Sequence, residues 1–415
     1  MTFRILFGIL IFTGVILLID WYLYRNIRVL FADKSALVQL SFKVLWWMWP
    51  FLFFFLFLVF RSLPSGFRNI ASNIVFIVLA SKLLPFIILL LGDAGSFLLK
   101  VPRLFASGSP LADESAAELI SRKQFMAKIL LGATVIPAFT LVYGIARTAF
   151  DFKIHRQKLR FPNLPASFSG FKVVQISDIH TGSLVNHHQL QKAVELINDL
   201  NPDVILFTGD IVNNKTDEAF PYVEILAQLR AKYGVYSTLG NHDYGDYHNW
   251  DSEEDKRQNF REMIDLHRRM GWNLMNNANK ILDINGEKIA ILGVENWGDQ
   301  LRFPKYGKIH DAKAGTEGVP FKILMSHDPS HWNAQITIAH KDIDLTLSGH
   351  THGFQFGVEI PGFKWSPSQY VYKQWAGLYE NEHQLLYVNR GLGCLGYMGR
   401  VGIRPEITFI ELEKA

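Results

Sequence analysis

Residues 171–180 read FKVVQISDIH, a short apolar run that ends in two polar side chains, Asp178 and His180. The mostly apolar run Phe171–Ser177 predicts a buried β-strand. Asp178 and His180 are two residues apart, so on an extended segment both side chains can point to the same side. This stretch therefore predicts a strand that delivers two potential ligands at its carboxyl end.

The same arrangement recurs along the second half of the chain. Predicted strands at 204–208, 234–238, 321–325 and 345–347 are each followed by a short polar motif. In chain order these motifs are Gly209-Asp210, Gly240-Asn241-His242-Asp243, Ser326-His327-Asp328 and Gly349-His350-Thr351-His352-Gly353. A helical pattern over 188–200 separates the first two strands. Strand–helix alternation indicates α/β layering, in which ligands lie beyond the carboxyl ends of the strands.

The residue types in these motifs point to metal chemistry. Carboxylates, imidazoles and an amide without thiolates suit divalent ions such as Mn, Fe or Zn. There are seven candidate ligands: Asp178, His180, Asp210, Asn241, His327, His350 and His352. That is too many for one ion, and one carboxylate could bridge two ions. Two ions about 3.5–4 Å apart clamp the attacking and leaving oxygens in phosphate-ester hydrolysis.

Taken together, the motifs resemble those of the calcineurin-like metallophosphoesterase superfamily and look closest to its bacterial YaeI/YkuE-like phosphodiesterase subgroup. The resemblance covers residues 171–415 and includes the tail at 387–393, Arg400 and residues 403–407. It implies an α/β domain built as a four-layer α/β/β/α sandwich. It also implies a hydrolase that cleaves phosphodiester or pyrophosphate bonds with a hydroxide generated at two divalent metal ions.

The resemblance also implies a role for each candidate residue. Asp178, His180 and His352 would hold the first metal, Asp210 would bridge, and Asn241, His327 and His350 would hold the second. His242 would face the substrate phosphate. Many relatives read G-D-x-x-D where this chain has Asn213, which can orient His242 but cannot supply the charge that raises its pKa. Arg400 is a candidate for bidentate contact with the phosphate, with a surface salt bridge as the alternative.

The first 150 residues have a different composition. They hold 14 Lys/Arg against 6 Asp/Glu, whereas residues 151–415 hold 28 against 32 and all 14 histidines. Four apolar stretches, 5–24, 44–60, 70–91 and 125–145, are long enough to cross about 30 Å of hydrocarbon. We therefore expect a four-span transmembrane region over 1–150, a linker over 151–170 and the catalytic domain over 171–415. Lys82 is expected to snorkel toward the interface.

Charge and composition limit the partners. Basic residues flanking the four stretches divide evenly, and only the cluster from Arg147 to Arg160 favours a cytoplasmic catalytic domain at the plasma (inner) membrane. The second half lacks a basic stripe, so nucleic acid is not expected as a partner. The expected partners are the lipid bilayer and a phosphoester substrate, for which a lipid-linked or envelope precursor is one option. A phosphomonoesterase and a membrane scaffold with an inactive phosphoesterase domain stay open as alternatives.

Three features outside the motifs leave further expectations. Eight aromatic residues follow the last motif, and they form either an apolar rim that contacts lipid or ordinary core packing. They are Phe354, Phe356, Phe363, Trp365, Tyr370, Tyr372, Trp375 and Tyr379. Residues 245–270 read as a helix from Glu253, either a lid or a solvated surface helix. Histidines outside the motifs, His267 among them, are expected to be solvated.

Overall fold

The computed structural model describes the chain except residues 1–2, 61–62, 64, 106–115, 185 and 301–302. The chain divides into two compact units, Met1–Tyr143 and Gly144–Ala415. The boundary falls inside a helix, so the last turn of that helix belongs to the second unit.

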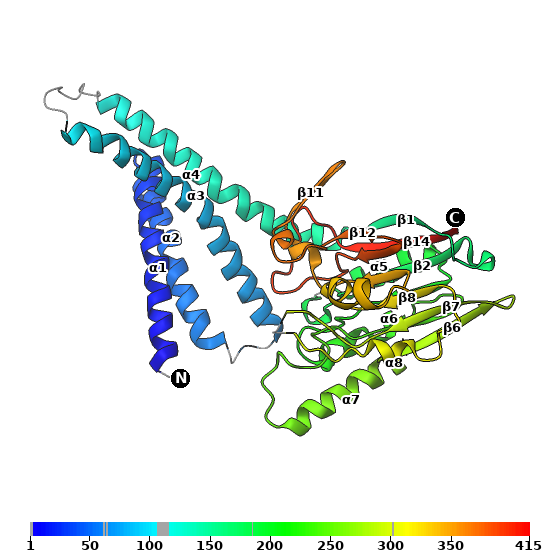
Figure 1. Cartoon of the computed structure of the whole chain (residues 1–415). Coiled ribbons are helices and arrows are strands. Elements are labelled where there is room, and N and C mark those ends of the chain that lie inside the picture. Colours follow the sequence, from blue (N-terminus) through cyan, green and yellow to red (C-terminus); the bar gives the residue numbers. More distant parts are fainter. Residues whose placement is uncertain (1–2, 61–62, 64, 106–115, 185, 301–302) are drawn as a thin grey trace. The chain divides into compact units, whose positions relative to one another are not determined.

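The first unit consists of long apolar helices (Figure 1). They are α1 (Phe3–Ile27), α2 (Ala36–Val59), α3 (Ser65–Phe105) and α4 (Ala116–Ala146), with a 3-10 turn η1 (Arg28–Phe31) after α1. Among the described residues, three segments are long and apolar enough to cross a membrane: Ala36–Leu56, Gly66–Leu98 and Arg122–Phe150. These cover three of the four predicted stretches. The fourth, over α1, stays a prediction.

The interior of the first unit holds a buried ion pair. Lys82 on α3 pairs with Asp20 on α1 and is only 9% exposed. The Nζ atom of Lys82 lies 5.2 Å from the ring centre of Trp46 and 5.8 Å from that of Trp49. The expectation that Lys82 snorkels was therefore wrong, because a carboxylate 62 residues away in sequence meets the ammonium inside the helix bundle.

The second unit contains two six-stranded sheets. The first has the order β1-β14-β2-β3-β4-β5 and the second β12-β13-β9-β8-β7-β6. The strands of the first sheet are β1 (Lys153–Phe161), β2 (Phe171–Ile176), β3 (Val204–Phe207), β4 (Val235–Ser237), β5 (Asn273–Leu274) and β14 (Glu406–Lys414). Those of the second are β6 (Ala278–Ile284), β7 (Glu287–Gly293), β8 (Lys322–Met325), β9 (Leu345–Ser348), β12 (Gly377–Asn381) and β13 (Gln384–Val388).

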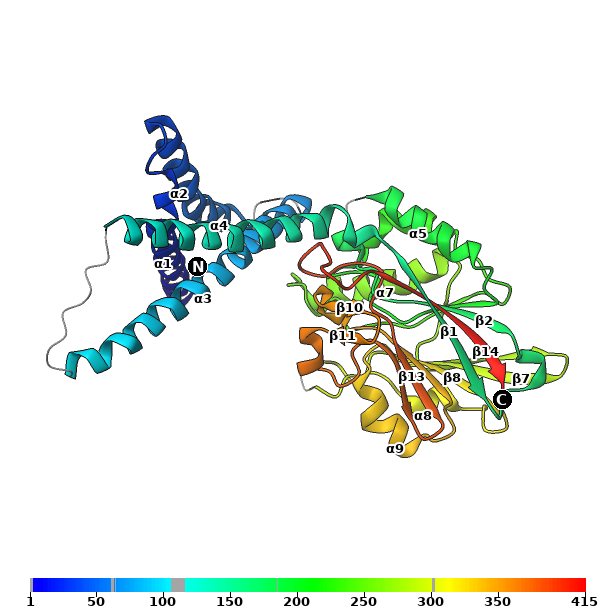
Figure 2. The same cartoon turned by 90° about the horizontal axis from the view of Figure 1, so that it is seen from above.

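Helices cover the outer face of each sheet, which confirms the four-layer sandwich. Side chains of β2, β3, β7, β8 and β9 fill the core between the sheets. The outer face of the first sheet packs on α5 (His187–Asp199), α6 (Val223–Leu226) and α7 (Glu253–Arg269). That of the second packs on α8 (Ile309–Lys313) and on a π-helical turn at Trp332–Ile336, which the exposed short helix α9 (Thr337–Ala339) follows. Figure 2 shows α5 on one side of the layers and α8 and α9 on the other.

The structure corrects the expected linker. Residues 153–161 form β1, which runs parallel to β14 from Lys153 opposite Glu406 to Phe161 opposite Lys414. Leu159 and Phe161 are buried between the sheets, whereas Lys158 and Arg160 pair with Glu413 at the edge. Because four of its nine residues are Lys or Arg, the apolar alternation of this strand is weak in the sequence.

The helix predicted from Glu253 is α7, a surface helix whose charged side chains face solvent while one side packs on the domain. The side chain of Ser252 caps it by accepting a hydrogen bond from the Asp255 amide at 3.1 Å. Met263 and Leu266 pack on the first sheet. His267 is fully buried, with Nδ1 2.9 Å from Ser237 Oγ, so the expectation of a solvated histidine was wrong here.

Candidate metal centre

The polar motifs of both sheets meet at the carboxyl ends of their strands. Asp178 and His180 follow β2, Asp210 follows β3, and Asn241 and His242 follow β4. His327 follows β8, and His350 and His352 follow β9. Since β2, β3 and β4 are parallel, as are β8 and β9, each sheet presents its ligands at one edge.

Two groups of side chains have the geometry to hold a cation. The first is Asp178, His180 and His352, all buried. Nε2 of His352 lies 3.2 Å from Asp178 Oδ1, and Nε2 of His180 lies 4.0 Å from the same oxygen. This is the trio that the resemblance assigns to the first metal.

The second group is Asp210, His327 and His350. Nε2 of His327 lies 3.1 Å from Asp210 Oδ2 and 3.2 Å from His350 Nδ1. The same Asp210 oxygen lies 3.5 Å from Nε2 of His180, which belongs to the first group. Asp210 therefore stands between the two groups, where a bridging carboxylate is expected.

Backbone carbonyls fix the orientation of the imidazoles. Nδ1 of His180 donates to the Val212 carbonyl at 3.1 Å, and Nδ1 of His327 donates to the Thr208 carbonyl at 2.7 Å. A histidine that donates from one ring nitrogen offers the lone pair of the other. Both rings therefore direct Nε2 toward the carboxylates, where it donates to them when protonated and offers its lone pair to a metal ion when neutral.

The backbone is strained where it carries the candidate ligands. Asp178, His180, Asp210, His350 and His352 all have positive φ, between 49° and 72°. Non-glycine residues avoid this region unless the surrounding structure holds them there, and such strain collects at functional sites. Gly349 has no room for a Cβ atom against Ser177 and Asp178, so glycine is required where the two sheets approach.

Unpaired polar atoms test whether the donor set fits a metal. Within the described part of the chain, His180 Nε2, His352 Nε2 and Asn241 Oδ1 are buried without a hydrogen-bond partner. Nδ2 of Asn241 donates to Tyr247 Oη at 2.9 Å, which leaves its Oδ1 for a ligand. Buried polar atoms are normally paired. Two imidazole nitrogens and an amide oxygen with nearby carboxylates fit divalent cations.

The electrostatics of the centre favour positive charge. Burial raises the pKa of Asp178 and Asp210, but the imidazoles of His352 and His327 outweigh it and hold both carboxyl pKa values below their usual range. Burial lowers the pKa of His327, but Asp210 outweighs it and raises that pKa to about 10. Burial lowers the pKa of His180 to about 3. The two carboxylates stay ionised and attract a cation.

His242 is held next to this cluster. Its backbone N–H donates to Asp210 Oδ1 at 2.9 Å, and its Nδ1 donates to the Asn213 carbonyl at 2.6 Å. Asn213 therefore orients His242 through its backbone, whereas its side chain donates to Ser183 Oγ at 2.8 Å. Asn213 and His242 are therefore in contact as expected, but the contact is made by the backbone carbonyl of Asn213 and not by its side-chain amide.

The structure corrects the expectation for Arg400. Its guanidinium is fully buried and donates to the carbonyls of Arg390 at 2.8 Å and Gly391 at 3.0 Å. The same guanidinium nitrogen lies 3.4 Å from His352 Nδ1. Arg400 therefore positions the loop behind His352. Its burial contradicts a surface salt bridge, while the bidentate phosphate contact stays a prediction.

Two buried aspartates at the site had no assigned role in the sequence. Asp243 accepts hydrogen bonds from the amides of Asp210 and Ile211 at 2.8 Å and of Gly240 at 2.9 Å. It ties the loop after β3 to the loop after β4. Asp328 is fully buried with Oδ2 3.6 Å from His350 Nε2. The signal was its position directly after His327 at a strand end.

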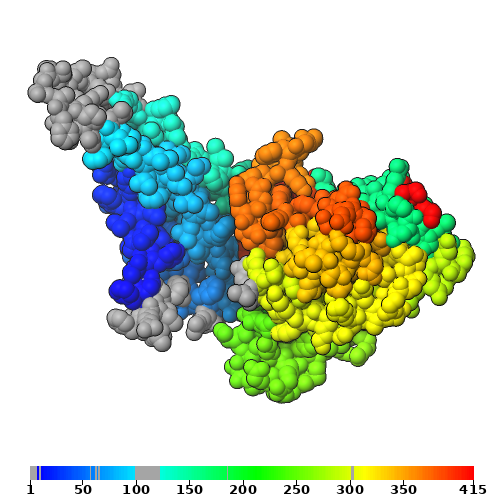
Figure 3. Space-filling view, in the orientation of Figure 1, coloured from blue at the N-terminus to red at the C-terminus, as the bar shows by residue number. Residues whose placement is uncertain are grey.

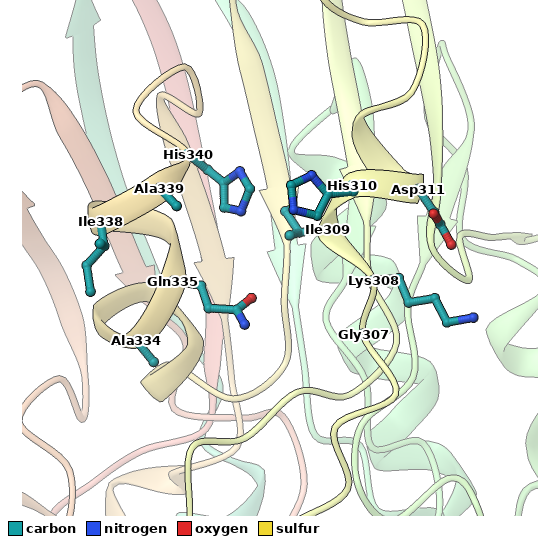
Figure 4. Close-up of a pocket in the computed structure, with 10 residues that line it drawn as sticks. All are labelled: Gly307, Lys308, Ile309, His310, Asp311, Ala334, Gln335, Ile338, Ala339 and His340. Carbon is teal, nitrogen blue, oxygen red and sulfur yellow. The ribbon is translucent and has the colours of Figure 1, made fainter.

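A surface pocket of about 480 Å³ lies away from these motifs (Figure 4). Its walls come from residues 307–311 and from the turn that carries Ala334, Gln335 and Ile338 to His340. The rings of His310 and His340 face each other with centroids 5.2 Å apart. Among the described residues no group with metal-ligand geometry includes either histidine, so the pocket lacks the donor set of the metal centre.

Comparison with known proteins agrees with this geometry. The model of the calcineurin-like phosphoesterase family matches residues 171–354, and that of a probable calcineurin-like phosphoesterase transmembrane domain matches residues 3–149. The chain is 30% identical over 302 residues to the uncharacterized metallophosphoesterase YkuE of Bacillus subtilis, covering 71% of this chain and 98% of that protein. The protein is a membrane-associated, metal-dependent phosphoesterase. It belongs to the calcineurin-like phosphoesterase family.

Other relatives are covered over a smaller share of their own length or are less identical than YkuE. A Danio rerio transmembrane protein with metallophosphoesterase domain is 33% identical over 312 residues, 72% of this chain and 66% of that protein. The UDP-2,3-diacylglucosamine pyrophosphatase LpxG of Chlamydia trachomatis is 28% identical over 287 residues, 56% of this chain and 81% of that protein. The chain spans about half the length of solved structures such as Haemophilus influenzae NAD nucleotidase (16% identity, TM-score 0.35, 54% of this chain and 45% of that one).

Proposed function

We propose that this protein hydrolyses a phosphodiester or pyrophosphate bond in a lipid-linked substrate, using two divalent ions, for which Mn, Fe or Zn fit the ligands. One observation carries the two-metal proposal. Oδ2 of Asp210 lies 3.1 Å from His327 Nε2 in one ligand group and 3.5 Å from His180 Nε2 in the other. A single carboxylate oxygen within reach of both groups is the arrangement that a bridged pair of ions needs.

The protein's own residues prepare the phosphate for attack. When bound, two divalent ions polarise the phosphoryl group and lower the pKa of water. Asp178, His180 and His352 would hold one ion, Asn241, His327 and His350 the other, with Asp210 between them. As the imidazolium, His242 would donate from Nε2 to the phosphate or to the leaving oxygen, because its Nδ1–H is already held by the Asn213 carbonyl at 2.6 Å.

A neutral partner limits what His242 can do. A carboxylate beside Nδ1 would stabilise the imidazolium, whereas a backbone carbonyl only orients the ring. We therefore assign His242 chiefly to transition-state charge stabilisation, with a lesser share in protonating the leaving group. A leaving group that needs little protonation, such as the phosphate side of a pyrophosphate, suits this arrangement better than an alkoxide.

The lipid-linked substrate rests on two supports. The chain belongs to a membrane-associated branch of the family, with apolar helices over residues 3–149. LpxG, whose name describes a pyrophosphatase of a diacylated nucleotide sugar, is 28% identical to it. A substrate that carries acyl chains stays in the bilayer, where a tethered catalytic domain meets it at high local concentration.

A substrate panel tests this proposal. The full-length, metal-loaded protein is assayed in vesicles with an aryl phosphodiester, an aryl phosphomonoester and a lipid-linked diphosphate. We expect the lipid-linked diphosphate to be cleaved most efficiently and the monoester least. Preference for the monoester would contradict the bond assignment. If the protein were an inactive scaffold, it would turn over no substrate faster than the His350→Ala variant does. His188→Ala, a histidine substitution at an exposed position outside the metal centre, serves as the matched control.

The orientation of the catalytic domain is part of the same proposal. The basic cluster from Arg147 to Arg160 follows α4 and favours the cytoplasmic face of the plasma membrane. A reporter fused after Ala415 tests it. A cytoplasmic end makes a C-terminal green fluorescent protein emit and an alkaline phosphatase fusion inactive, and the opposite pair of results would reverse the orientation.

A further inference from the structure

A short hairpin beside the metal centre carries its apolar side chains on the outer face and its charged side chains on the face toward the domain. Its strands are β10 (Val358–Ile360) and β11 (Phe363–Trp365), joined by the exposed turn Pro361-Gly362. The register pairs Val358 with Trp365, Glu359 with Lys364 and Ile360 with Phe363. Because side chains alternate along a strand, the two apolar pairs share one face and the charged pair occupies the other.

The charged face of this hairpin contacts the domain through its side-chain ends, although Lys364 as a whole stays exposed. Glu359 pairs with the buried Arg390 at 2.7 Å. Nζ of Lys364 donates to the Ala376 carbonyl at 2.5 Å and lies 4.9 Å from the ring centre of Tyr379. These contacts fix the hairpin on the domain and determine which face points away.

The apolar face points outward. The exposed fractions are 43% for Val358, 58% for Ile360, 54% for Phe363 and 37% for Trp365. Figure 3 shows the surface around residue 360 standing out from the globular unit. A hairpin in water places its charges outside, so this inversion indicates an apolar environment for the outer face.

Neighbouring aromatic residues extend this apolar surface. Tyr370 is 76% exposed, and Phe354 and Val371 are exposed as well. Tyr372 and Trp375, which lie in the same segment of sequence, are buried. The two alternatives for the aromatic segment therefore divide between its residues. The exposed set combines Trp, Tyr, Phe and the exposed Lys373, a composition typical of membrane–water interfaces.

Hydrogen bonds connect the base of the hairpin to the end of the last apolar helix. The Gly357 amide donates to the Val401 carbonyl at 2.9 Å, and the Val401 amide donates to the Gln355 carbonyl at 2.8 Å. The adjacent Arg400 amide donates to the Gly144 carbonyl at 3.3 Å. Gly144 lies in the last turn of α4, within the globular unit and inside the candidate span Arg122–Phe150.

The same cluster includes the loop that carries His352. Oγ of Ser366, the residue after β11, donates to the Gly353 carbonyl at 2.7 Å. Thr351 Oγ1 donates to the Trp375 carbonyl at 2.6 Å. The hairpin, the exit of α4 and the His352 loop therefore form one connected part of the globular unit.

We infer that the hairpin Val358–Trp365, together with Tyr370 and Val371, inserts into the headgroup–acyl boundary of the bilayer that α4 leaves. Apolar and aromatic side chains are stabilised at this depth. Their shallow insertion would add to the anchoring that the membrane-spanning helices of the same chain provide. The insertion brings the metal centre to the membrane surface. This inference goes beyond the proposed function, because it holds for any substrate that reaches the site.

Depth-dependent quenching tests the insertion. In a Cys394→Ala background, Phe363→Cys is labelled with an environment-sensitive fluorophore in full-length protein reconstituted into vesicles. We expect quenching by lipids with a nitroxide on the acyl chain to be severalfold stronger than for a label at Glu382→Cys, on the exposed β12–β13 turn. Equal weak quenching at both sites would overturn the inference. A Phe363 label shielded from iodide but not quenched by lipid would also overturn it, by showing a protein partner or a second copy.

A charged variant separates this inference from the proposed function. Ile360→Glu/Phe363→Glu should keep hydrolysis of a soluble aryl phosphodiester and lose most turnover of a lipid-embedded substrate, with Ile360→Ser/Phe363→Ser intermediate. Equal loss on both substrates would contradict an interfacial role for the hairpin. If the unmodified protein cleaves no lipid-linked substrate, the proposed substrate fails, while the quenching result alone decides the insertion.

Discussion

Both units bury charge, but they balance it in different ways. In the first unit Asp20 and Lys82 form a one-to-one pair, with Oδ1 of Asp20 on the ammonium and two indole rings beside it. In the second unit Asp178 and Asp210 lie fully buried among imidazoles. Within the described residues, buried His180 Nε2, His352 Nε2 and Asn241 Oδ1 have no hydrogen-bond partner there.

The difference separates a structural cluster from a binding site. The charges of the Asp20–Lys82 pair cancel within the protein, although Asp20 Oδ2 has no hydrogen-bond partner among the described residues, and removing such a pair as a whole costs little. Carboxylates that face uncommitted ligand atoms leave a place for a cation. Burial of charged residues alone therefore does not mark a functional site, whereas convergent unpaired donor atoms do.

Neutralising the bridging carboxylate should have the largest effect. Asp210→Asn removes the charge shared by both ligand groups, and we expect hydrolysis to fall by roughly 10³-fold or more, several kcal/mol of lost charge stabilisation. The amide can still accept the His242 backbone hydrogen bond, but the buried pair with His327 is lost, so the metal-free protein should also melt at a lower temperature. Turnover assays and thermal melts with and without metal measure this. Unchanged turnover would remove the two-metal mechanism.

Breaking the Asp20–Lys82 pair should lower the stability of the fold without acting on the chemistry of hydrolysis. Lys82→Met leaves Asp20 buried without its cation, which costs about 3–5 kcal/mol. The double variant Asp20→Leu/Lys82→Met should recover most of that loss, because no unpaired charge remains. Denaturation of the full chain in detergent micelles measures both. A double variant as unstable as the single one would show that the pair has a role beyond mutual neutralisation.

His267 is a buried titratable group that carries no charge, and it should make the stability of the protein depend on pH. Burial lowers the pKa of His267 to about 3, against about 6.5 for an unfolded histidine. As pH falls below about 6.5 the unfolded chain binds the proton first, so stability is complete above that pH and lost between about 6.5 and 3. The loss reaches about 2 kcal/mol at pH 5.

Melting curves at pH 7.5 and pH 5 check this linkage. His267→Gln should reduce the drop in melting temperature between the two pH values, even if the variant is less stable at both. His188→Gln, at an exposed position at the start of α5, should leave the drop unchanged. An identical drop in all three proteins would show that His267 is not the source.

The smallest expected effect is at Tyr247. Its hydroxyl accepts the Asn241 amide at 2.9 Å, which turns Oδ1 of Asn241 toward the metal site. Tyr247→Phe removes one hydrogen bond, worth about 0.5–1.5 kcal/mol, so metal affinity should fall severalfold. Titration with Mn or Zn, read as the rise in melting temperature with metal concentration, measures it. A rise in melting temperature identical to that of the unmodified protein would show that the Tyr247 hydroxyl is not needed to orient Asn241 for metal binding.

The metal centre was predictable because its chemistry lies in short motifs. Asp178 and His180 sit two residues apart at the end of an apolar strand, and each later motif follows its own strand. Residue type and position together therefore single out candidate ligands, and the structure brings six of the seven into two groups with metal-ligand geometry. The α/β layering also follows from strand and helix patterning, since each apolar run must be covered on both faces, whereas the four-layer sandwich was implied by the family resemblance.

Other features depend on partners that the sequence does not reveal. Strand β1 is rich in basic residues, and it is recognisable only beside β14, some 250 residues later. Lys82 finds Asp20 across 62 residues. Arg400 and Asn213 act through backbone carbonyls, and every residue has a carbonyl whatever its side chain. Long-range pairing and backbone partners require the folded chain.

Metal stoichiometry tests the central claim most directly. Elemental analysis of the purified full-length protein, after saturation with Mn or Zn and removal of loose metal, should give two ions per chain. His352→Ala and His350→Ala should each retain about one, since each removes a ligand from only one of the two groups. A single ion in the unmodified protein, or two in both variants, would contradict the account of Asp210 as the bridge between two metal sites.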